Sequence, residues 1–231
     1  MGLRRELRKV LGYQEPEKLL NDSYAQEGED MILDRIFEGK HGGFFIDVGA
    51  HHPIRFSNTY KFYRKDWRGI NIDAMPGSMD IFAKIRPLDI NLETPVSDKE
   101  ETLPFYVFNE PALNTFSNEV AAERSKKPEY QVVNIFNITT KTLASILEEY
   151  LPENKRIDFL TIDAEGFDFQ ILQSNNWEKY KPSIVLIESD LPLAEMHRSP
   201  INQLMTNHGY EVFAKTVKTY FFKEKSFSVN L

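Results

Sequence analysis

The stretch that decides the fold is residues 44–53, which read FFIDVGAHHP. The run Gly43–Val48 is apolar at nearly every position, which is typical of a strand buried on both faces in a parallel sheet. The run closes on an acid and a glycine, and glycine accepts the dihedral angles of a sharp turn. Ligands of open α/β sheets bind beyond the carboxyl ends of the strands. The stretch therefore predicts a central strand that ends at a ligand site.

The rest of the chain repeats this kind of run and alternates it with helical patterns. The further predicted strands are Gly69–Asp73, Leu103–Phe108, Val132–Ile138, Ile157–Asp163, Ser183–Ser189, Tyr210–Lys215 and Thr219–Lys223. The predicted helices are Asp30–Phe37, Thr142–Leu151, Gly166–Asn175 and Ile201–His208. Alternating strands and helices predict an α/β fold with a doubly wound, Rossmann-like and mostly parallel sheet. The last two runs predict an antiparallel hairpin.

Composition narrows the class of protein. The chain has 231 residues, and 28 Lys+Arg against 35 Asp+Glu give a net charge of −7, which argues against a partner nucleic acid. We predict a single domain over residues 1–231, with an N-terminal helical segment at 1–40, an α/β core at 41–231 and a small insertion near 100–138. The segment Met1–Gln14 has the spacing of an amphipathic helix, which we expect to pack on its own domain, the alternative being a helix that binds a membrane surface or a partner.

Two absences in the sequence add expectations about environment and metal chemistry. No apolar run is long enough to span a bilayer, so we expect no stable membrane insertion and a cytoplasmic location. The chain contains no cysteine, which confines any metal to oxygen and imidazole ligands. The oligomeric state leaves no signature that we can interpret in the sequence.

Four of the predicted strands end in a carboxylate. These acids are Asp47, Asp73, Asp163 and Glu188. A single Asp at a strand end is explained by helix capping, but capping would use Ser, Thr and Asn as often. Because the carboxyl ends of parallel strands share one edge of the sheet, the series favours a ligand site there.

The spacing of the first two acids indicates the kind of ligand. Asp73 closes the strand that follows the Gly49 turn, where an acid binds ribose hydroxyls in Rossmann-like folds. The chain lacks the G-x-G-x-x-G loop that cradles phosphates. A ribose acid without a phosphate loop suits a nucleoside cofactor that carries no phosphate, and S-adenosylmethionine is the common one.

An ordered series of motifs resembles the FkbM-type methyltransferase family. The motifs are Ser23–Asp30, Phe45–Pro53, Ser57–Thr59, Trp67–Asp73, Arg86–Pro87, Val96–Asp98 and Ile162–Gly166. The resemblance implies a class I methyltransferase fold with a seven-stranded sheet, an antiparallel last strand and S-adenosyl-L-methionine as cofactor. It also implies O-methylation of a sugar hydroxyl in a glycan, a nucleotide sugar or a glycosylated metabolite. His51 stands where the wider class often has another glycine, as it does in this family.

The same resemblance assigns cofactor-binding residues motif by motif. Asp47 and Gly49 would contact the methionine portion, and Asp73 would bind the ribose. Ser97 and Asp98 would flank the adenine. The remaining members of the predicted cofactor-binding set are Gln26, Glu29, Asn58 and Asp163, of which the first two would close the site near the amino-acid moiety.

A sugar hydroxyl is a poor acid, so its methylation needs a general base or a metal. His51 and His52 are candidate bases because imidazole titrates near neutral pH, although either could instead shape the turn. Asp163, Glu188 and Asp190 offer the oxygen ligands that Mg²⁺ or Mn²⁺ prefers. Without a metal, Asp163 and Glu165 would orient the substrate or act as the base.

Further substrate contacts and two other functions complete the expectations. Glu165, His197 and Arg198 are candidate substrate-binding residues, and the loops 109–130 and 191–200 are expected to build the acceptor pocket. One alternative is a nucleotide-dependent oxidoreductase on the same topology. The other is a cofactor-binding scaffold that has lost catalysis.

Overall fold

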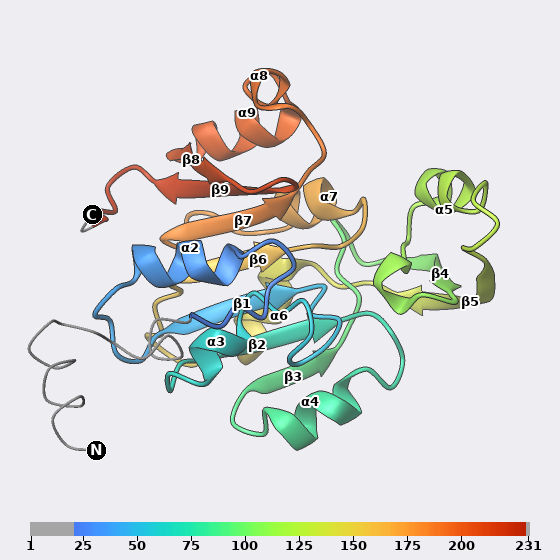
Figure 1. The fold of residues 1–231 in the computed structure, drawn as a ribbon, viewed down its shortest axis with the longest axis horizontal. Coiled ribbons are helices and arrows are strands. Elements are labelled where there is room, and N and C mark those ends of the chain that lie inside the picture. Colours follow the sequence, from blue (N-terminus) through green and yellow to red (C-terminus); the bar gives the residue numbers. More distant parts are fainter. Residues whose placement is uncertain (1–20, 230–231) are drawn as a thin grey trace, which may run out of the picture.

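The computed structural model describes residues 21–229 and has an α/β sheet at its centre (Figure 1). Within that range the strand order is β3-β2-β1-β6-β7-β9-β8. The strands are β1 (Phe44–Val48), β2 (Arg68–Asp73), β3 (Ile90–Glu93), β6 (Phe159–Ile162), β7 (Ile184–Glu188), β8 (Tyr210–Lys215) and β9 (Thr219–Glu224). Strands β1, β2, β3, β6 and β7 pair in parallel, whereas β9 is antiparallel to both β7 and β8. The predicted fold, with its antiparallel last strand, is confirmed.

The sheet is covered on both faces, as the apolar runs predict. All five residues of β1 are buried. One face packs against α2 (Glu29–Ile36) and α3 (Tyr60–Tyr63), through Leu33 and Phe62. The other face packs against α6 (Leu143–Tyr150), α7 (Asp168–Gln173) and α9 (Pro200–Asn207). Helix α6 begins where the Thr142 hydroxyl accepts a hydrogen bond from the Ser145 amide.

Several short elements are absent from the sequence-based prediction. They include β3, α4 (Met79–Ile85), α8 (Leu193–Met196), the short helix α3 and the two helical segments within residues 111–124. Strand β3 lies at the sheet edge and none of its four residues is fully buried, so it lacks the apolar run that marks the central strands. The predicted helix at Met1–Gln14 lies outside the described residues. Across residues 21–229, no helix is both long and apolar enough to cross a bilayer.

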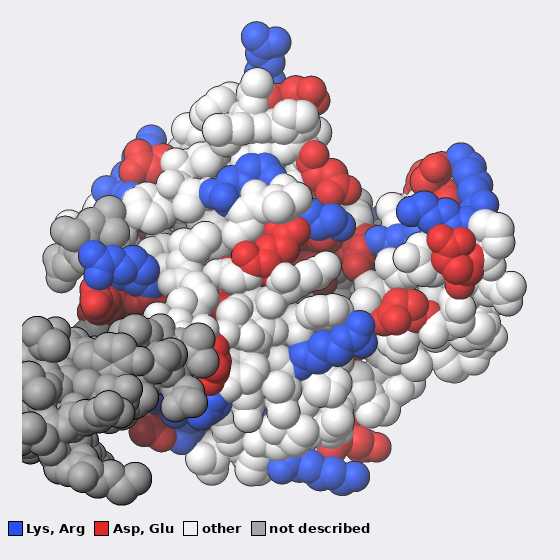
Figure 2. All heavy atoms as spheres, in the orientation of Figure 1, with Lys and Arg blue, Asp and Glu red and all other residues white. Residues whose placement is uncertain are grey.

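Residues 102–139 form an arm that projects beside the sheet (Figure 1). Its antiparallel strands are β4 (Thr102–Phe108) and β5 (Val132–Thr139), joined through the 3-10 helix η2 (Pro111–Leu113) and α5 (Asn118–Arg124). Phe105, Val107 and Phe116 form the apolar centre of the arm and pack against Met75 and Phe167 of the sheet core. In Figure 2, acidic side chains gather in the recess between the core and the arm.

Candidate active site

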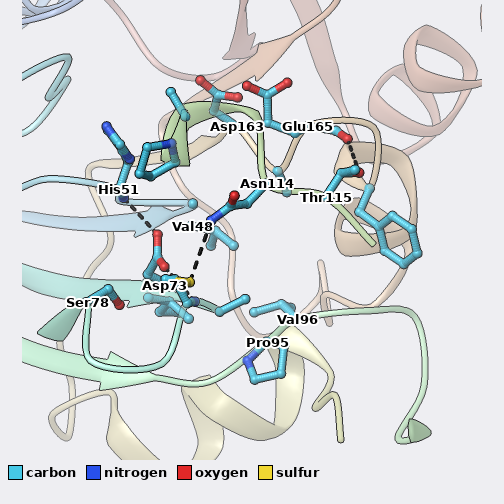
Figure 3. A pocket seen from close by; sticks show the side chains of 18 of the residues that line it. Val48, His51, Asp73, Ser78, Pro95, Val96, Asn114, Thr115, Asp163 and Glu165 are labelled. Atoms are coloured by element: carbon cyan, nitrogen blue, oxygen red, sulfur yellow. Dashed lines mark hydrogen bonds between the residues drawn. The ribbon is translucent and has the colours of Figure 1, made fainter. Parts of the chain in front are cut away.

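A cavity of about 410 Å³ opens at the carboxyl ends of β1, β2 and β6. The sheet core contributes one part of the wall, including Gly49, His51, Asp73, Val96 and Asp163. The arm contributes the other part, including Phe105, Pro111, Asn114, Thr115 and Phe116. Figure 3 shows Asp163 and Glu165 along one side of this cavity and Asp73 across from them. The position agrees with the expected site at the strand ends.

Gly49 makes the turn after β1 possible. Its φ is +81°, and a Cβ added there would lie 1.8 Å from the Asp163 carbonyl oxygen. The amides of Gly49 and Ala50 both donate to the Ile72 carbonyl, at 2.9 and 3.1 Å. The glycine therefore lets the first turn press against the end of β6, which brings Asp163 to the edge of the cavity.

Asp73 lies at the cavity wall with both carboxylate oxygens engaged by backbone. The His51 amide donates to Oδ2 and the Met75 amide donates to Oδ1, each at 2.8 Å. Burial raises the pKa of Asp73, and these two amide donors oppose the rise. The carboxylate is thereby held in one orientation, with remaining lone pairs available to ligand hydroxyls.

Asp47 belongs to a buried network and does not line the cavity. Thr59 Oγ1 donates to its carboxylate at 2.6 Å, and the Arg86 guanidinium donates to the same Thr59 oxygen at 2.9 Å. Arg86 also pairs with Asp89 at 2.8 Å, with both side chains fully buried. Asp47 thus fastens the β1–α3 loop to β1, and its predicted contact with the cofactor is absent from the cavity wall.

Three carboxylates converge at the ends of β6 and β7. Oxygen atoms of Asp163, Glu165 and Glu188 lie within 4.8 Å of one another. Asp163 Oδ1 is buried and has no hydrogen-bond partner among the described residues. Burial raises the pKa of Asp163 well above its usual range, and the neighbouring Glu188 and Glu165 raise it further. The cluster therefore makes the ionised Asp163 carboxylate a stronger proton acceptor than an ordinary aspartate.

Two cations flank this carboxylate cluster. Arg124, from α5 of the arm, pairs with Glu165, and Lys218 Nζ lies 3.3 Å from Glu188. Asp190, predicted as a third metal ligand beside Asp163 and Glu188, is 87% exposed and lies outside the cluster. Glu165, which the sequence predicted as a substrate contact, is instead the third carboxylate of the cluster. Its φ of +50° turns the chain at the end of β6.

A small recess of about 20 Å³ adjoins the main cavity near the cluster. Gln26 and Asp163 line both spaces, and Glu29, Asn58 and Glu188 line the recess. Thr216 and Thr219 donate to Glu29 Oε1 at 3.1 Å, so this carboxylate ties α2 to the β8–β9 turn. Asn58 Nδ2 donates to Thr161 Oγ1 at 3.0 Å. Of these predicted cofactor residues, Gln26 and Asp163 also line the main cavity, whereas Glu29 and Asn58 do not.

The two adjacent histidines have different surroundings. His52 Nδ1 accepts hydrogen bonds from the Ile54 and Arg55 amides, so its ring shapes the turn. His51 has a φ of +51°, and both histidines line the cavity. Burial lowers the pKa of both rings, which leaves them neutral at pH 7.

The remaining predicted contacts lie away from the cavity wall. Ser97 is buried and donates to Asp98 at 3.1 Å, while Pro95 and Val96 take the wall positions beside them. His197 and Arg198 are exposed after α8 and do not line the cavity. The sequence-based reasoning missed Asn114, Phe105 and Phe116 as individual wall residues. The expectation that loop 109–130 borders the pocket pointed toward Asn114 and Phe116, but nothing pointed to Phe105, which lies in the predicted strand Leu103–Phe108.

The buried acid Asp168 gives the loop 163–168 a pH dependence. Its carboxylate accepts from the Ala164 and Gly166 amides, and burial raises its pKa from 3.8 to about 7. The folded chain therefore retains a proton at Asp168 that the unfolded chain releases between about pH 4 and pH 7. Because the folded chain binds this proton more tightly than the unfolded chain, the contribution of Asp168 to the free energy of unfolding is fully present at low pH and is lost as the pH rises from about 4 through about 7.

We expect Asp168→Asn to gain stability relative to wild type as the pH is raised from 6 to 8. His51 and His52, whose pKa values are lowered, contribute with the opposite sign in both proteins and cancel in the comparison. Urea midpoints of both proteins at pH 6, 7 and 8 measure the difference. A difference that stays constant or shrinks with rising pH would contradict the prediction.

The fold and the cavity together define a class. A seven-stranded sheet with one antiparallel strand, an acid at the carboxyl end of β2 and a ligand cavity at the carboxyl edge is the class I methyltransferase architecture. A profile of the methyltransferase FkbM domain matches residues 47–212. The chain belongs to the FkbM methyltransferase family. This result sets aside the oxidoreductase alternative.

The chain is similar to solved structures at low sequence identity. An FkbM methyltransferase from Methylobacillus flagellatus KT is 10% identical, with a TM-score of 0.51 over 91% of this chain and 51% of that one. The chain thus spans about half the length of that protein. A putative RNA methyltransferase from Pyrococcus horikoshii is 12% identical, with a TM-score of 0.45 over 96% of this chain and 98% of the other. No curated protein matches the chain.

Proposed function

We propose that the protein transfers a methyl group from S-adenosyl-L-methionine to a sugar hydroxyl in a glycan, a nucleotide sugar or a glycosylated metabolite. The observation that carries this proposal is Asp163 Oδ1 at the cavity edge, which has no hydrogen-bond partner within residues 21–229 and belongs to a cluster of three carboxylates. A sugar presents several hydroxyl donors, and carboxylates are strong acceptors for them. A cluster of this kind supports a polyhydroxyl acceptor.

The cavity fits the proposed cofactor in chemistry as well as in place. Asp73 is oriented for ribose hydroxyls, and Val96 and Met75 supply apolar wall beside it. The carboxylates of Asp163 and Glu165 lie across the cavity, where they favour a cation. The cofactor supplies, when bound, a methyl group on a positively charged sulfur.

Within this proposal Asp163 receives the proton of the attacking hydroxyl. The bound cofactor would supply the methyl group and its sulfur would keep the electron pair of the carbon–sulfur bond, while the acceptor oxygen would take the methyl group and the Asp163 carboxylate would take the proton. A raised pKa makes Asp163 a stronger base than an ordinary carboxylate. Glu188 and Glu165 are available to orient the acceptor. Burial makes His51 a weaker base, so we assign the proton transfer to Asp163.

Calorimetry and a screen of acceptors test this function. We expect S-adenosylhomocysteine to bind the purified protein, and labelled methyl from S-adenosylmethionine to appear on a member of a nucleotide-sugar and glycan panel. An alkali-stable label identifies an O-methyl ether rather than an ester. The absence of S-adenosylhomocysteine binding at millimolar concentration would sink the proposal.

The neighbouring histidines allow a matched test of the base. His51→Asn retains a residue that tolerates positive φ, and His52→Asn retains an oxygen near the Nδ1 position that accepts from the Ile54 and Arg55 amides. We expect both variants to keep turnover within about tenfold of wild type, since neither ring takes the proton in this proposal. Turnover at saturating substrate measures this. A loss of about a hundredfold or more in His51→Asn alone would move the base to His51.

A divalent ion is a further proposal for the same cluster. Asp163, Glu165 and Glu188 would hold Mg²⁺ or Mn²⁺, which would polarise the acceptor hydroxyl. The oxygen donors fit such an ion, although Arg124 and Lys218 already contact two of them. We expect chelator to lower transfer and Mn²⁺ to restore it, and Mn²⁺ binding measured by calorimetry to be lost in Asp163→Asn. Full activity in chelator without bound Mn²⁺ would remove the ion from the mechanism.

A further inference from the structure

We propose that the arm forms one wall of the adenosine site, and that Asn114 Nδ2 donates a hydrogen bond to the adenosyl group of the cofactor. The inference rests on the proposed function, because it takes the cofactor to be S-adenosylmethionine. It assigns to the arm a role in binding the cofactor, whereas the sequence indicated only an acceptor pocket for that region.

The orientation of the Asn114 amide is set by the arm itself. Its Oδ1 accepts a hydrogen bond from the Phe108 amide at 2.9 Å. Because an amide nitrogen cannot accept that bond, the Nδ2 group must point the other way. The neighbouring Thr115 pairs with Tyr106 of β4 through two backbone hydrogen bonds, which holds the segment in register.

The donor on Asn114 is underused and faces the cavity. Within the described chain, the one partner of Nδ2 is Met75 Sδ at 3.6 Å, a weak acceptor. In Figure 3 the amide extends into the cavity between Asp73 and the carboxylates. An amide group has two N–H donors, so at least one remains for a ligand atom.

The surroundings of this donor indicate the adenosyl end of the ligand. Met75, which Asn114 contacts, is bound through its own amide to the ribose acid Asp73. Beside it, Phe116 and Phe167 have ring centroids 5.5 Å apart and line the cavity together with Val96. An apolar and aromatic wall suits a flat purine, whose ring nitrogens accept hydrogen bonds. In Figure 3 the acid cluster, where the sugar would bind, lies on the opposite side of Asn114 from Asp73.

Contacts with the core place the arm firmly enough for this role. Thr115 Oγ1 donates to the Glu165 carbonyl at 2.7 Å, and Arg124 pairs with the Glu165 carboxylate. A Cβ added at Gly166 would lie 2.9 Å from Val120 of α5, which shows how closely the arm approaches the loop after β6. These contacts hold the arm in place without a ligand, so Asn114 needs no large movement to reach one.

The test measures binding without an acceptor. Calorimetry gives the affinities of wild type, Asn114→Asp and Asn114→Ala for S-adenosylhomocysteine and for adenosine. Asn114→Asp keeps the oxygen that accepts from the Phe108 amide and loses the donor, so it separates ligand binding from the arm's internal bond. The matched control is Asn109→Ala, an arm asparagine that bonds to Glu129 and Gln131 and does not line the cavity.

We expect Asn114→Ala to weaken the binding of both ligands by about fivefold, and Asn114→Asp to weaken it by about tenfold or more. The factor should be the same for adenosine as for S-adenosylhomocysteine, and Asn109→Ala should bind like wild type. Unchanged affinity in Asn114→Asp, or a loss confined to S-adenosylhomocysteine, would overturn the inference. Failure of the wild type to bind either ligand would instead overturn the proposed function.

Discussion

Asp163→Asn is expected to lower turnover by about a thousandfold, because it removes the carboxylate that takes the hydroxyl proton in the proposed mechanism. The substitution keeps the shape of the side chain and the backbone carbonyl that packs on Gly49. We therefore expect affinity for S-adenosylhomocysteine to change by no more than a few-fold. Initial rates at saturating S-adenosylmethionine, with the acceptor identified by the screen, measure the loss.

Asp190→Asn is the matched control for this variant. Asp190 follows the next strand, is 87% exposed and lies outside the carboxylate cluster, so the same change there should leave turnover unchanged. Equal losses in the two variants, or wild-type turnover in Asp163→Asn, would contradict the role of Asp163.

A second readout of Asp163→Asn needs no acceptor. Because burial and the neighbouring glutamates raise the pKa of Asp163, ionising this side chain costs more free energy in the folded chain than in the unfolded chain. Asparagine is neutral in both states. We expect the variant to be more stable than wild type at pH 8 and to lose that advantage toward pH 4, below which both forms of the chain are protonated.

Of the variants proposed for this protein, Gly49→Ala is expected to lose the most stability. The added methyl group would have to occupy a position 1.8 Å from the Asp163 carbonyl oxygen, and its three nearest atoms are all backbone atoms of Asp163 and Ala164, so no flexible side chain can move aside. We expect the free energy of unfolding to fall by at least about 3 kcal/mol beyond the cost of the left-handed backbone. Urea unfolding followed by circular dichroism measures the change.

Gly77→Ala isolates the clash from the backbone strain. Gly77 has a φ of +82°, nearly the same as Gly49, but a Cβ added there meets nothing within 4 Å. This control should lose only about 1–2 kcal/mol from the left-handed conformation. Similar losses in the two variants would show that the turn after β1 relaxes away from β6.

The central sheet could be predicted because its signal is local and strong. The strands β1, β6 and β7 are buried on both faces, so their apolar runs are nearly continuous and stand out from the rest of the chain. The edge strand β3 is partly exposed and only four residues long, and its pattern is too weak to be recognised. The same contrast explains why α6, with Thr142 as its cap, was expected and the four-residue α3 was not.

For the site, the sequence predicted the series of acids but not which of them meet. Asp163 and Glu188 meet because β6 and β7 are neighbours in the sheet. Glu165 joins them, and Asp190 does not, because of the backbone turn at Glu165 and the pairing with Arg124 from the arm. Contacts of this kind join residues far apart in the chain, and no local pattern encodes them.

The residues of FFIDVGAHHP and the strands like it determined by themselves that this chain forms an α/β sheet with its ligand site at the carboxyl edge. Burial of continuous apolar runs is a property of each segment, so the sequence alone carries it. The tertiary structure decided which groups the cavity presents. Asp47 is withdrawn into a network with Thr59 and Arg86, and Asn114 is brought in by the arm. Both outcomes depend on where remote segments pack, which only the folded chain sets.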